Sequence, residues 1–346
     1  MNYCRKCVMP DTRPGTSLDS EGVCLACRNY EKRKLVDWNA RWKQLEKIAW
    51  QANKKGGVLI PVSGGKDSYF LNHLADKLDL KVTLFRVADP FGITQAAQHN
   101  IRNMVDEFNA PFYQWEMGGK KFRELFREQF LQLGNFPALD MTIYSEPIKQ
   151  AYLLGIPLVL WGENSAYEYG TSDTESRYAL SAFNYCQQAF GFKKAAQYCS
   201  RVVPVYASYF VPWSGAYNYN IAVSYGFKNL DQMDHWNRLG TIENYDSLDE
   251  VGWQVSHFLK YRKFGFGRAT DIASRWIREG GINREEAIVL VNREDHRLDP
   301  VILEDFLRVT GFTEKEFWDT ADRFTNRNIF CKVDGRWAKK PELEIS

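Results

Sequence analysis

The chain has 346 residues, of which 45% are hydrophobic and 25% are charged, a composition typical of a globular protein of one or two domains. Lys and Arg (45) nearly balance Asp and Glu (43), so a net charge of +2 gives no general attraction to nucleic acid or anionic membranes. No apolar run reaches the roughly 18 residues of a membrane span, and residues 1–7 lack the apolar core of a signal peptide. We therefore expect a cytoplasmic protein, in which paired cysteines favour metal binding over disulfides.

Residues 1–30 carry four of the seven cysteines, many turn formers and few large apolar residues. Such a segment cannot build a hydrophobic core of its own and needs a cross-link, such as a disulfide bond or a bound metal ion, to stabilise it. Two CxxC pairs, Cys4 with Cys7 and Cys24 with Cys27, have the separation typical of a four-cysteine zinc site. Because four thiolates leave no open coordination position, the pattern predicts structural zinc, with an iron–sulfur cluster as the main alternative.

Hydrophobic periodicity in the next part of the chain predicts strands that alternate with helices. We expect strands at 58–62, 81–87, 112–115 and 157–161, and helices at 31–55, after the loop at 63–68, and at 95–108, 120–133 and 144–154. This alternation predicts a doubly wound, mostly parallel α/β sheet. In such sheets, ligands bind beyond the carboxyl ends of the strands.

The rest of the chain divides into an irregular segment and a helical region. Residues 165–220, rich in Tyr, Ser, Gly and Asn, are expected to be irregular and functional. Helices are expected at 248–262, 270–279, 284–292, 300–310 and 314–323. The predicted organisation is a zinc module at 1–30, a linking helix at 31–56, an α/β domain at 57–245 and a helical region at 246–346.

The sequence SGGKDS at 63–68, between a predicted strand and a predicted helix, is the sharpest signal in the chain. Two glycines let the main chain approach an anion, and the helix points its free N–H groups and positive dipole end at that anion. Asp67 is unexpected beside phosphate unless it holds Mg²⁺. The spacing is not that of a Walker A loop. It resembles the PP-loop, SGGxDS, of the ATP pyrophosphatase superfamily of HUP-like fold, which cleaves ATP between its α and β phosphates and forms adenylates.

Two further segments contribute candidate site residues. Glu163 follows a predicted strand and is a candidate second Mg²⁺ ligand, or otherwise a solvated loop carboxylate. In KFGFGR, Lys263 and Arg268 are candidates to clamp the triphosphate or leaving pyrophosphate, since exposed loops seldom contain two Phe-Gly pairs. The catalytic residues expected are Lys66, Asp67, Glu163, Lys263 and Arg268. The ATP-binding residues expected are Val62, Ser63, Gly64, Gly65, Lys66, Asp67, Ser68, Val87 and Gly162.

The chain as a whole resembles the N-acetyl sugar amidotransferases of bacterial surface-polysaccharide and flagellin-sugar biosynthesis. The shared features lie between residues 4 and 271, and they are the two CxxC pairs, Met9-Pro10-Asp11-Thr12, the PP-loop, Gly162-Glu163-Asn164, Tyr167-Glu168-Tyr169-Gly170 and the segment 263–268.

This resemblance implies a reaction at an acetamido group of a nucleotide-activated sugar, as in lipopolysaccharide O-antigen synthesis. ATP would adenylate the amide oxygen to an O-adenylyl imidate, and ammonia would displace AMP to leave an acetamidino group. The family relies on ammonia-supplying subunits similar to the glutaminase and cyclase of histidine biosynthesis. Residues 165–220 would then form a lid that excludes water, and the aromatic candidates for stacking on a base or sugar are Tyr167, Tyr169, Trp213 and Tyr217.

Two other functions stay open. Some tRNA sulfurtransferases also join a cysteine-rich zinc module to a PP-loop, but they need further catalytic cysteines, often as a CxxC pair. Here Cys186 and Cys199 stand thirteen positions apart, and the chain is nearly neutral. The third possibility is an ATP-binding subunit without catalysis, which would release no pyrophosphate with any substrate.

Overall fold

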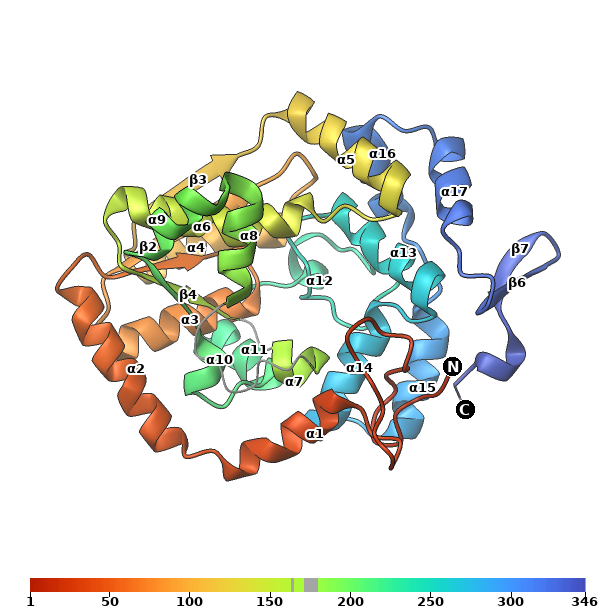
Figure 1. Ribbon diagram of the computed structural model, residues 1–346, viewed down its shortest axis with the longest axis horizontal. Coiled ribbons are helices and arrows are strands. Elements are labelled where there is room, and N and C mark those ends of the chain that lie inside the picture. Colours follow the sequence, from red (N-terminus) through yellow and green to blue (C-terminus); the bar gives the residue numbers. More distant parts are fainter. Residues whose placement is uncertain (163–164, 171–179, 346) are drawn as a thin grey trace.

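The computed structural model describes residues 1–162, 165–170 and 180–345. Its centre is a five-stranded parallel sheet with the order β3-β2-β1-β4-β5 (Figure 1). The strands are β1 (Val58–Pro61), β2 (Val82–Ala88), β3 (Phe112–Glu116), β4 (Leu158–Trp161) and β5 (Val203–Tyr206). The expected doubly wound, parallel α/β fold is confirmed.

Alternating side chains of the strands bury both faces of the sheet. Val58 and Ile60 of β1 join one core cluster, whereas Leu59 between them joins a second cluster on the other face. Successive side chains of a strand point to opposite faces of the sheet. Because both faces are buried here, apolar residues follow one another along the strand and do not alternate with polar ones.

Helices cover the two faces of the sheet. On one face the core cluster contains residues of α2 (Trp38–Asn53), α3 (Lys66–Lys77), α4 (Gln95–Glu107), α10 (Ala207–Phe210) and α11 (Gly215–Ser224). On the other face lie residues of α6 (Ala138–Leu154), α8 (Leu180–Phe190) and α9 (Phe192–Cys199). The strand order turns back between β1 and β4, and this topological switch point is where such sheets bind ligands.

The C-terminal half is a helical region with its own phenylalanine-rich core, which includes Phe122, Phe126, Phe306 and Phe317. Its elements are α12 (Leu230–Met233), η2 (Gly252–Gln254), α13 (Val255–Phe264), α14 (Arg268–Glu279), α15 (Arg284–Glu294), α16 (Pro300–Thr310) and α17 (Glu314–Arg323). The helix α5 (Gly119–Leu133) packs into the same core. The chain ends in a hairpin of β6 (Phe330–Val333) and β7 (Arg336–Lys339), and the short helix η3 (Pro341–Leu343).

The N-terminal segment leads into α1 (Leu25–Lys32) and η1 (Arg33–Leu35). It lies against α14 and α15 rather than apart from the molecule (Figure 1). Val8 packs with Ala273 and Ala287 of these helices, and Cys24 shares a buried cluster with Phe266. Among the described residues, no helix is long and apolar enough to cross a membrane.

Two expectations about elements were wrong. The predicted helix at 31–55 is broken, because α1 ends at Lys32 and α2 begins only at Trp38, where Asp37 caps it by accepting a hydrogen bond from Ala40 N–H (2.9 Å). Residues 165–220 are not an irregular segment as a whole: the described part contains α7 (Ser165–Tyr169), α8, α9, β5, α10 and α11. The helices α7 and α10 have only five and four residues, and β5 contains Pro204, so no periodic pattern marks these three elements.

Candidate active site

The PP-loop turns sharply between β1 and α3. Gly64 has a φ of +78°, and a Cβ there would lie 2.8 Å from the main-chain oxygen of Ala97. Only glycine fits this combination of conformation and space. The Asn100 amide donates to the Gly64 carbonyl (2.9 Å) and holds the turn against α4. The free N–H groups at the start of α3 are therefore presented at the switch point of the sheet.

Lys66 and Asp67 form a fixed pair at the start of α3. Lys66 Nζ lies 2.8 Å from Asp67 Oδ2, and the Asn218 amide of α11 donates to Asp67 Oδ1 (2.8 Å). Burial alone lowers the pKa of Lys66, but the adjacent Asp67 carboxylate outweighs it, so this pKa lies above its usual value. The Lys66 side chain is 10% exposed and that of Asp67 is 37% exposed, which leaves the carboxylate within reach of a ligand or a magnesium ion.

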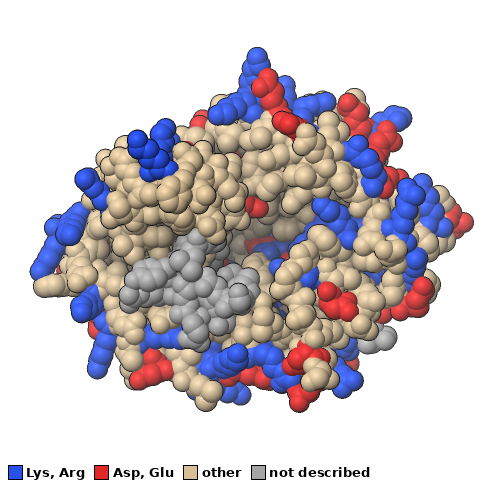
Figure 2. All heavy atoms as spheres, viewed as in Figure 1, with Lys and Arg blue, Asp and Glu red and all other residues tan. Residues whose placement is uncertain are grey.

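A cavity of about 590 Å³ opens beside this pair. It brings together the PP-loop residues Lys66 and Asp67, Gly162 after β4, and Lys263 and Arg268 of the KFGFGR segment. Figure 2 shows the hollow near the centre of this face, with acidic and basic side chains inside it. Residues almost 200 positions apart in the sequence thus line one space at the carboxyl edge of the sheet.

Ion pairs order the wall of the cavity around the start of α14. Arg268 binds Asp246 with two hydrogen bonds of 2.6 Å each, and Asp271 binds both Lys260 and Arg13. Burial alone would raise the pKa of Asp246 and of Asp271. The guanidinium of Arg268 and the ammonium of Lys260, respectively, outweigh burial and hold both pKa values well below the usual range. Both carboxylates are therefore charged at neutral pH.

Two further residues lie in this wall. Arg275 Nη2 lies 2.6 Å from Glu243 and its Nη1 lies 3.9 Å from Glu168, which also lines the cavity. Burial, followed by the charges of Lys260 and Arg268, holds the pKa of His257 well below its usual value, so this histidine is neutral at neutral pH.

The remaining expected ATP-binding residues lie around the loop. Val62 is buried in the core and its N–H donates to Phe85 O (2.9 Å), while Ser68 Oγ accepts a hydrogen bond from Ser63 N–H (3.3 Å). Val87 packs near the end of β2 against the core on the α6 side, and it is not among the residues that line the cavity. Glu163 lies outside the described residues.

The four aromatic residues expected to stack on a base or sugar lie in different surroundings. Tyr169 lines the cavity. Tyr167 and Trp213 are buried packing residues, with Trp213 against Phe70 (ring centroids 5.3 Å apart), and Tyr217 is half exposed beside the same phenylalanine. Only Tyr169 of these four is thus placed in this cavity.

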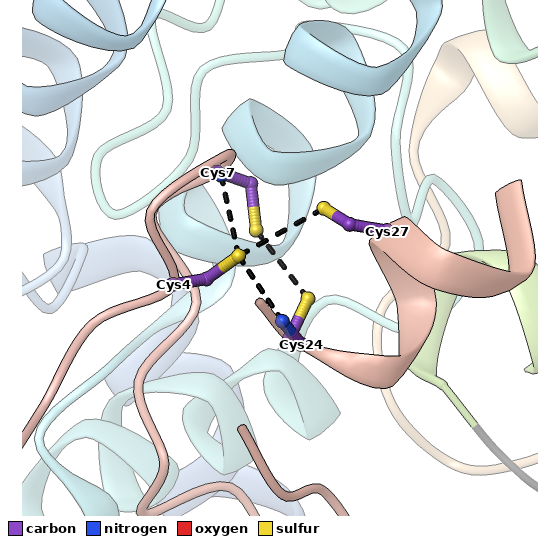
Figure 3. Close-up of side chains that lie close together, drawn as sticks. All are labelled: Cys4, Cys7, Cys24 and Cys27. Carbon is purple, nitrogen blue, oxygen red and sulfur yellow. Dashed lines mark hydrogen bonds between the residues drawn. The ribbon is translucent and has the colours of Figure 1, made fainter. Parts of the chain in front are cut away.

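The four cysteines of the two CxxC pairs form one buried cluster (Figure 3). Their sulfur atoms lie within 4.8 Å of one another, with Cys7 Sγ 3.7 Å from Cys24 Sγ and Cys4 Sγ 4.0 Å from Cys27 Sγ. Tetrahedral zinc with Zn–S bonds of about 2.3 Å needs sulfur atoms about 3.8 Å apart. The cluster therefore fits a structural zinc ion. It is the one group of metal-binding side chains found among the described residues.

The sequence analysis missed several residues that the fold places at the cavity beside the PP-loop. Asn218 orients Asp67, Arg13 reaches the cavity from the cysteine-rich segment, and Arg275 joins it from α14. None of the three stands in a local pattern that marks it. Glu168 belongs to the motif Tyr167-Glu168-Tyr169-Gly170 and Asp271 lies at the end of the region of shared features, but neither was singled out as a site residue.

Comparisons with known proteins add a family for the C-terminal part. Residues 239–343 match the family model of the LPS biosynthesis protein WbpG-like, C-terminal domain. This segment contains Lys263 and Arg268, and the match is consistent with the resemblance that the motifs indicate. No curated protein matches the chain.

Two solved structures are similar to this chain. The NH3-dependent NAD synthetase from Campylobacter jejuni subsp. jejuni has 20% sequence identity over 47% of this chain and 77% of its own, with a TM-score of 0.29. The NMN synthetase from Francisella tularensis has 11% identity over 82% of this chain and 96% of its own, with a TM-score of 0.34. Likenesses at this level carry no conclusion about activity.

Proposed function

We propose that this chain, in which a PP-loop α/β domain is joined to a WbpG-like LPS biosynthesis segment, is an ATP-dependent amidotransferase. Its acceptor is a nucleotide-activated N-acetyl sugar, and it converts the acetamido group to an acetamidino group. The observation that carries this proposal is the single cavity lined by Lys66 and Asp67 of the PP-loop and by Lys263 and Arg268 of the C-terminal segment.

The chemistry has two displacements. The amide oxygen of the acceptor attacks the α phosphorus of ATP, the bond between the α phosphorus and the α–β bridging oxygen breaks, and pyrophosphate leaves. Ammonia then attacks the imidate carbon, the carbon–oxygen bond breaks, and AMP leaves with that oxygen. An amide oxygen is a poor leaving group until it is adenylated, so the ATP step makes the second step possible.

The residues of the cavity suit this sequence of events. The start of α3 and Lys66 stabilise the negative charge that develops on the phosphates of ATP, and Arg268 and Lys263 add positive charge elsewhere in the lining of the same cavity. Asp67, fixed by Asn218, would hold a magnesium ion, which supplies charge neutralisation between the phosphates. Water must be excluded, since it would return the imidate to the amide.

Ammonia is proposed to come from glutaminase and cyclase-like partner subunits, as the family resemblance implies. The reaction is expected to take place in the cytoplasm, where ATP and nucleotide sugars are available.

Two observations on Cys186 and Cys199 bear on the sulfurtransferase alternative, one in favour of it and one against it. The fold brings the thiols of Cys186 and Cys199, on α8 and α9, next to each other. The pair packs in the core near α6, where Cys186 Sγ lies 3.8 Å from Ser145 O, and neither cysteine lines the cavity. Two adjacent thiols away from the ATP loop do not favour sulfur transfer to an adenylated base.

The decisive experiment measures pyrophosphate release from ATP and Mg²⁺ with ammonium chloride and a panel of UDP- and CMP-linked N-acetyl sugars. Mass spectrometry follows the acceptor in the same reactions. We expect pyrophosphate, AMP and a product lighter by about one mass unit, since oxygen is replaced by NH. Pyrophosphate release with tRNA and a sulfur donor, and with no sugar, would replace this proposal by the sulfurtransferase.

A further inference from the structure

The charged residues that line the cavity fall into two groups that differ in their balance of positive and negative charge. Around the PP-loop, Lys66 is paired with Asp67 (2.8 Å) and Arg275 faces Glu168 (3.9 Å). This inner group has no excess of positive charge. It suits a polyphosphate that arrives with its own magnesium ion.

The outer group lies around the start of α14 and is positive. The four cations Arg13, Lys260, Lys263 and Arg268 share the cavity lining with three acidic residues outside the inner group, Asp140, Asp246 and Asp271. Lys263 Nζ donates to the main-chain oxygen of Leu133 (2.9 Å) instead of pairing with a carboxylate. A group of this kind binds phosphate without a metal ion.

We propose that the outer group is the subsite for the diphosphate of the acceptor, and that the four-cysteine module is part of this subsite because it supplies Arg13. The inference rests on the proposed function in one respect, namely that the acceptor is a nucleotide-activated sugar. It assigns to the module a role in acceptor binding beyond its own stability.

Arg13 is held in place from three sides. Its Nη1 lies 2.5 Å from Asp271 Oδ1, and its guanidinium stacks over the rings of Tyr169 (4.5 Å) and Phe266 (5.5 Å). The side chain is 15% exposed, so its remaining N–H groups are largely dehydrated before a ligand binds. A guanidinium fixed in this way loses little entropy when it binds phosphate.

The module is tied to both walls of the cavity. Thr12 Oγ1 donates to Phe264 O (2.6 Å), at the end of α13, and Thr16 Oγ1 donates to Tyr169 O (3.1 Å), at the end of α7. Arg13 therefore sits between two anchored residues. Its position depends on the fold of the cysteine cluster that precedes and follows it in the chain.

The test compares two probes, UDP and the ATP analogue AMP-PNP with Mg²⁺, by calorimetry on the full chain, and no acceptor is added, so that the α–β bond of the analogue is not attacked. Arg13→Met is expected to weaken UDP binding by about 10- to 100-fold, the effect of losing one charge-assisted contact. AMP-PNP binding is expected to stay within about twofold of the unmutated protein, because the inner group is intact. Arg13→Lys should restore part of the UDP affinity, and Arg5→Met, on the exposed side of the same module, should change neither.

Lys263→Met gives an independent check. This substitution leaves no carboxylate without its partner, so the fold should tolerate it, and it too should weaken UDP more than AMP-PNP. The inference is overturned if the unmutated protein does not bind UDP, or if Arg13→Met and Lys263→Met affect AMP-PNP as much as UDP. Failure of the proposed function looks different: the outer group then binds UDP, yet no acceptor supports pyrophosphate release.

Discussion

At the scale of single residues, Asp67 is the side chain on which the proposed chemistry most depends. Replacing it by Asn keeps the shape and can keep the hydrogen bond from Asn218, but it removes the charge that would hold magnesium. We expect Asp67→Asn to lower the rate of pyrophosphate release by about 100-fold or more, with little change in melting temperature. Asp76→Asn, an exposed position in the same helix, is the matched control. Normal turnover of Asp67→Asn would remove Asp67 from the mechanism.

A second residue, Asp89, makes stability depend on pH. Burial, in spite of a hydrogen bond from Phe91 N–H and with the help of the nearby Asp249 charge, raises the pKa of Asp89 to about 7. The folded state therefore binds more protons than the unfolded state between about pH 4 and about pH 7. The contribution of Asp89 to the free energy of unfolding is largest below this window, and it falls as the pH rises through it.

Asp89→Asn should remove this dependence. Relative to the unmutated protein, we expect the free energy of unfolding of the variant to rise by on the order of 2–3 kcal/mol between about pH 5 and about pH 8. Chemical denaturation at both pH values measures it, and Asp106→Asn, on the exposed side of α4, serves as the control. Parallel pH profiles for Asp89→Asn and the unmutated protein would contradict this account.

At the scale of elements, the contact between α7 and α1 links the cavity wall to the cysteine-rich module. Gly170, which ends α7, has a φ of +77°, and a Cβ there would lie 2.7 Å from the main-chain nitrogen of Ala26 in α1. Gly155, which ends α6, has a similar φ of +72° but open space around its Cβ position. A side chain at Gly155 would therefore add backbone strain alone, whereas a side chain at Gly170 would add the same strain and a clash with α1.

Alanine at these two positions should have unequal effects. Gly155→Ala is expected to cost about 1–2 kcal/mol, the strain of a left-handed conformation with a side chain. Gly170→Ala should cost about 1–3 kcal/mol more, because α7 must move away from α1. Equal losses in denaturant titrations would show that the two helices are not in close contact.

The elements predicted best from the sequence are those with a long amphipathic pattern. The helices expected at 300–310 and 314–323 are found as α16 and α17, and the four expected strands appear as β1 to β4. The strand β5 escaped prediction because Val203 is exposed and Pro204 follows it, so β5 lacks the continuous buried apolar run that marks β1 and β4. Only tertiary pairing marks such a segment as a strand.

At the scale of the whole molecule, the site could be predicted only where its chemistry is local. The PP-loop and the cysteine pairs are short patterns, and the structure places each of them in a single cluster or turn. Asn218, Arg275 and Arg13 come from α11, α14 and the N-terminal segment, and nothing in their neighbours shows where they meet. Their convergence results from packing between segments that are far apart in the chain.

The same packing predicts that the cysteine cluster stabilises more than its own segment. Cys24 and Cys27 share a buried cluster with Phe266 of the cavity wall, and Val8 packs on α14 and α15. Cys27→Ser should abolish bound zinc and lower the melting temperature of the whole chain. A loss of about 3 kcal/mol, small for a structural zinc site, shifts the melting temperature by roughly 4 °C in a chain of this size.

Cys331→Ser, a free cysteine in the terminal hairpin, is the matched control and should change neither property. Zinc content by mass spectrometry and melting by calorimetry are measured on the same preparations. A single transition at lower temperature in Cys27→Ser is expected, because the module has no independent core and shares its apolar residues with α14 and α15. Complete loss of zinc with an unchanged transition would mean that the metal binds the cluster without holding the cavity wall in place.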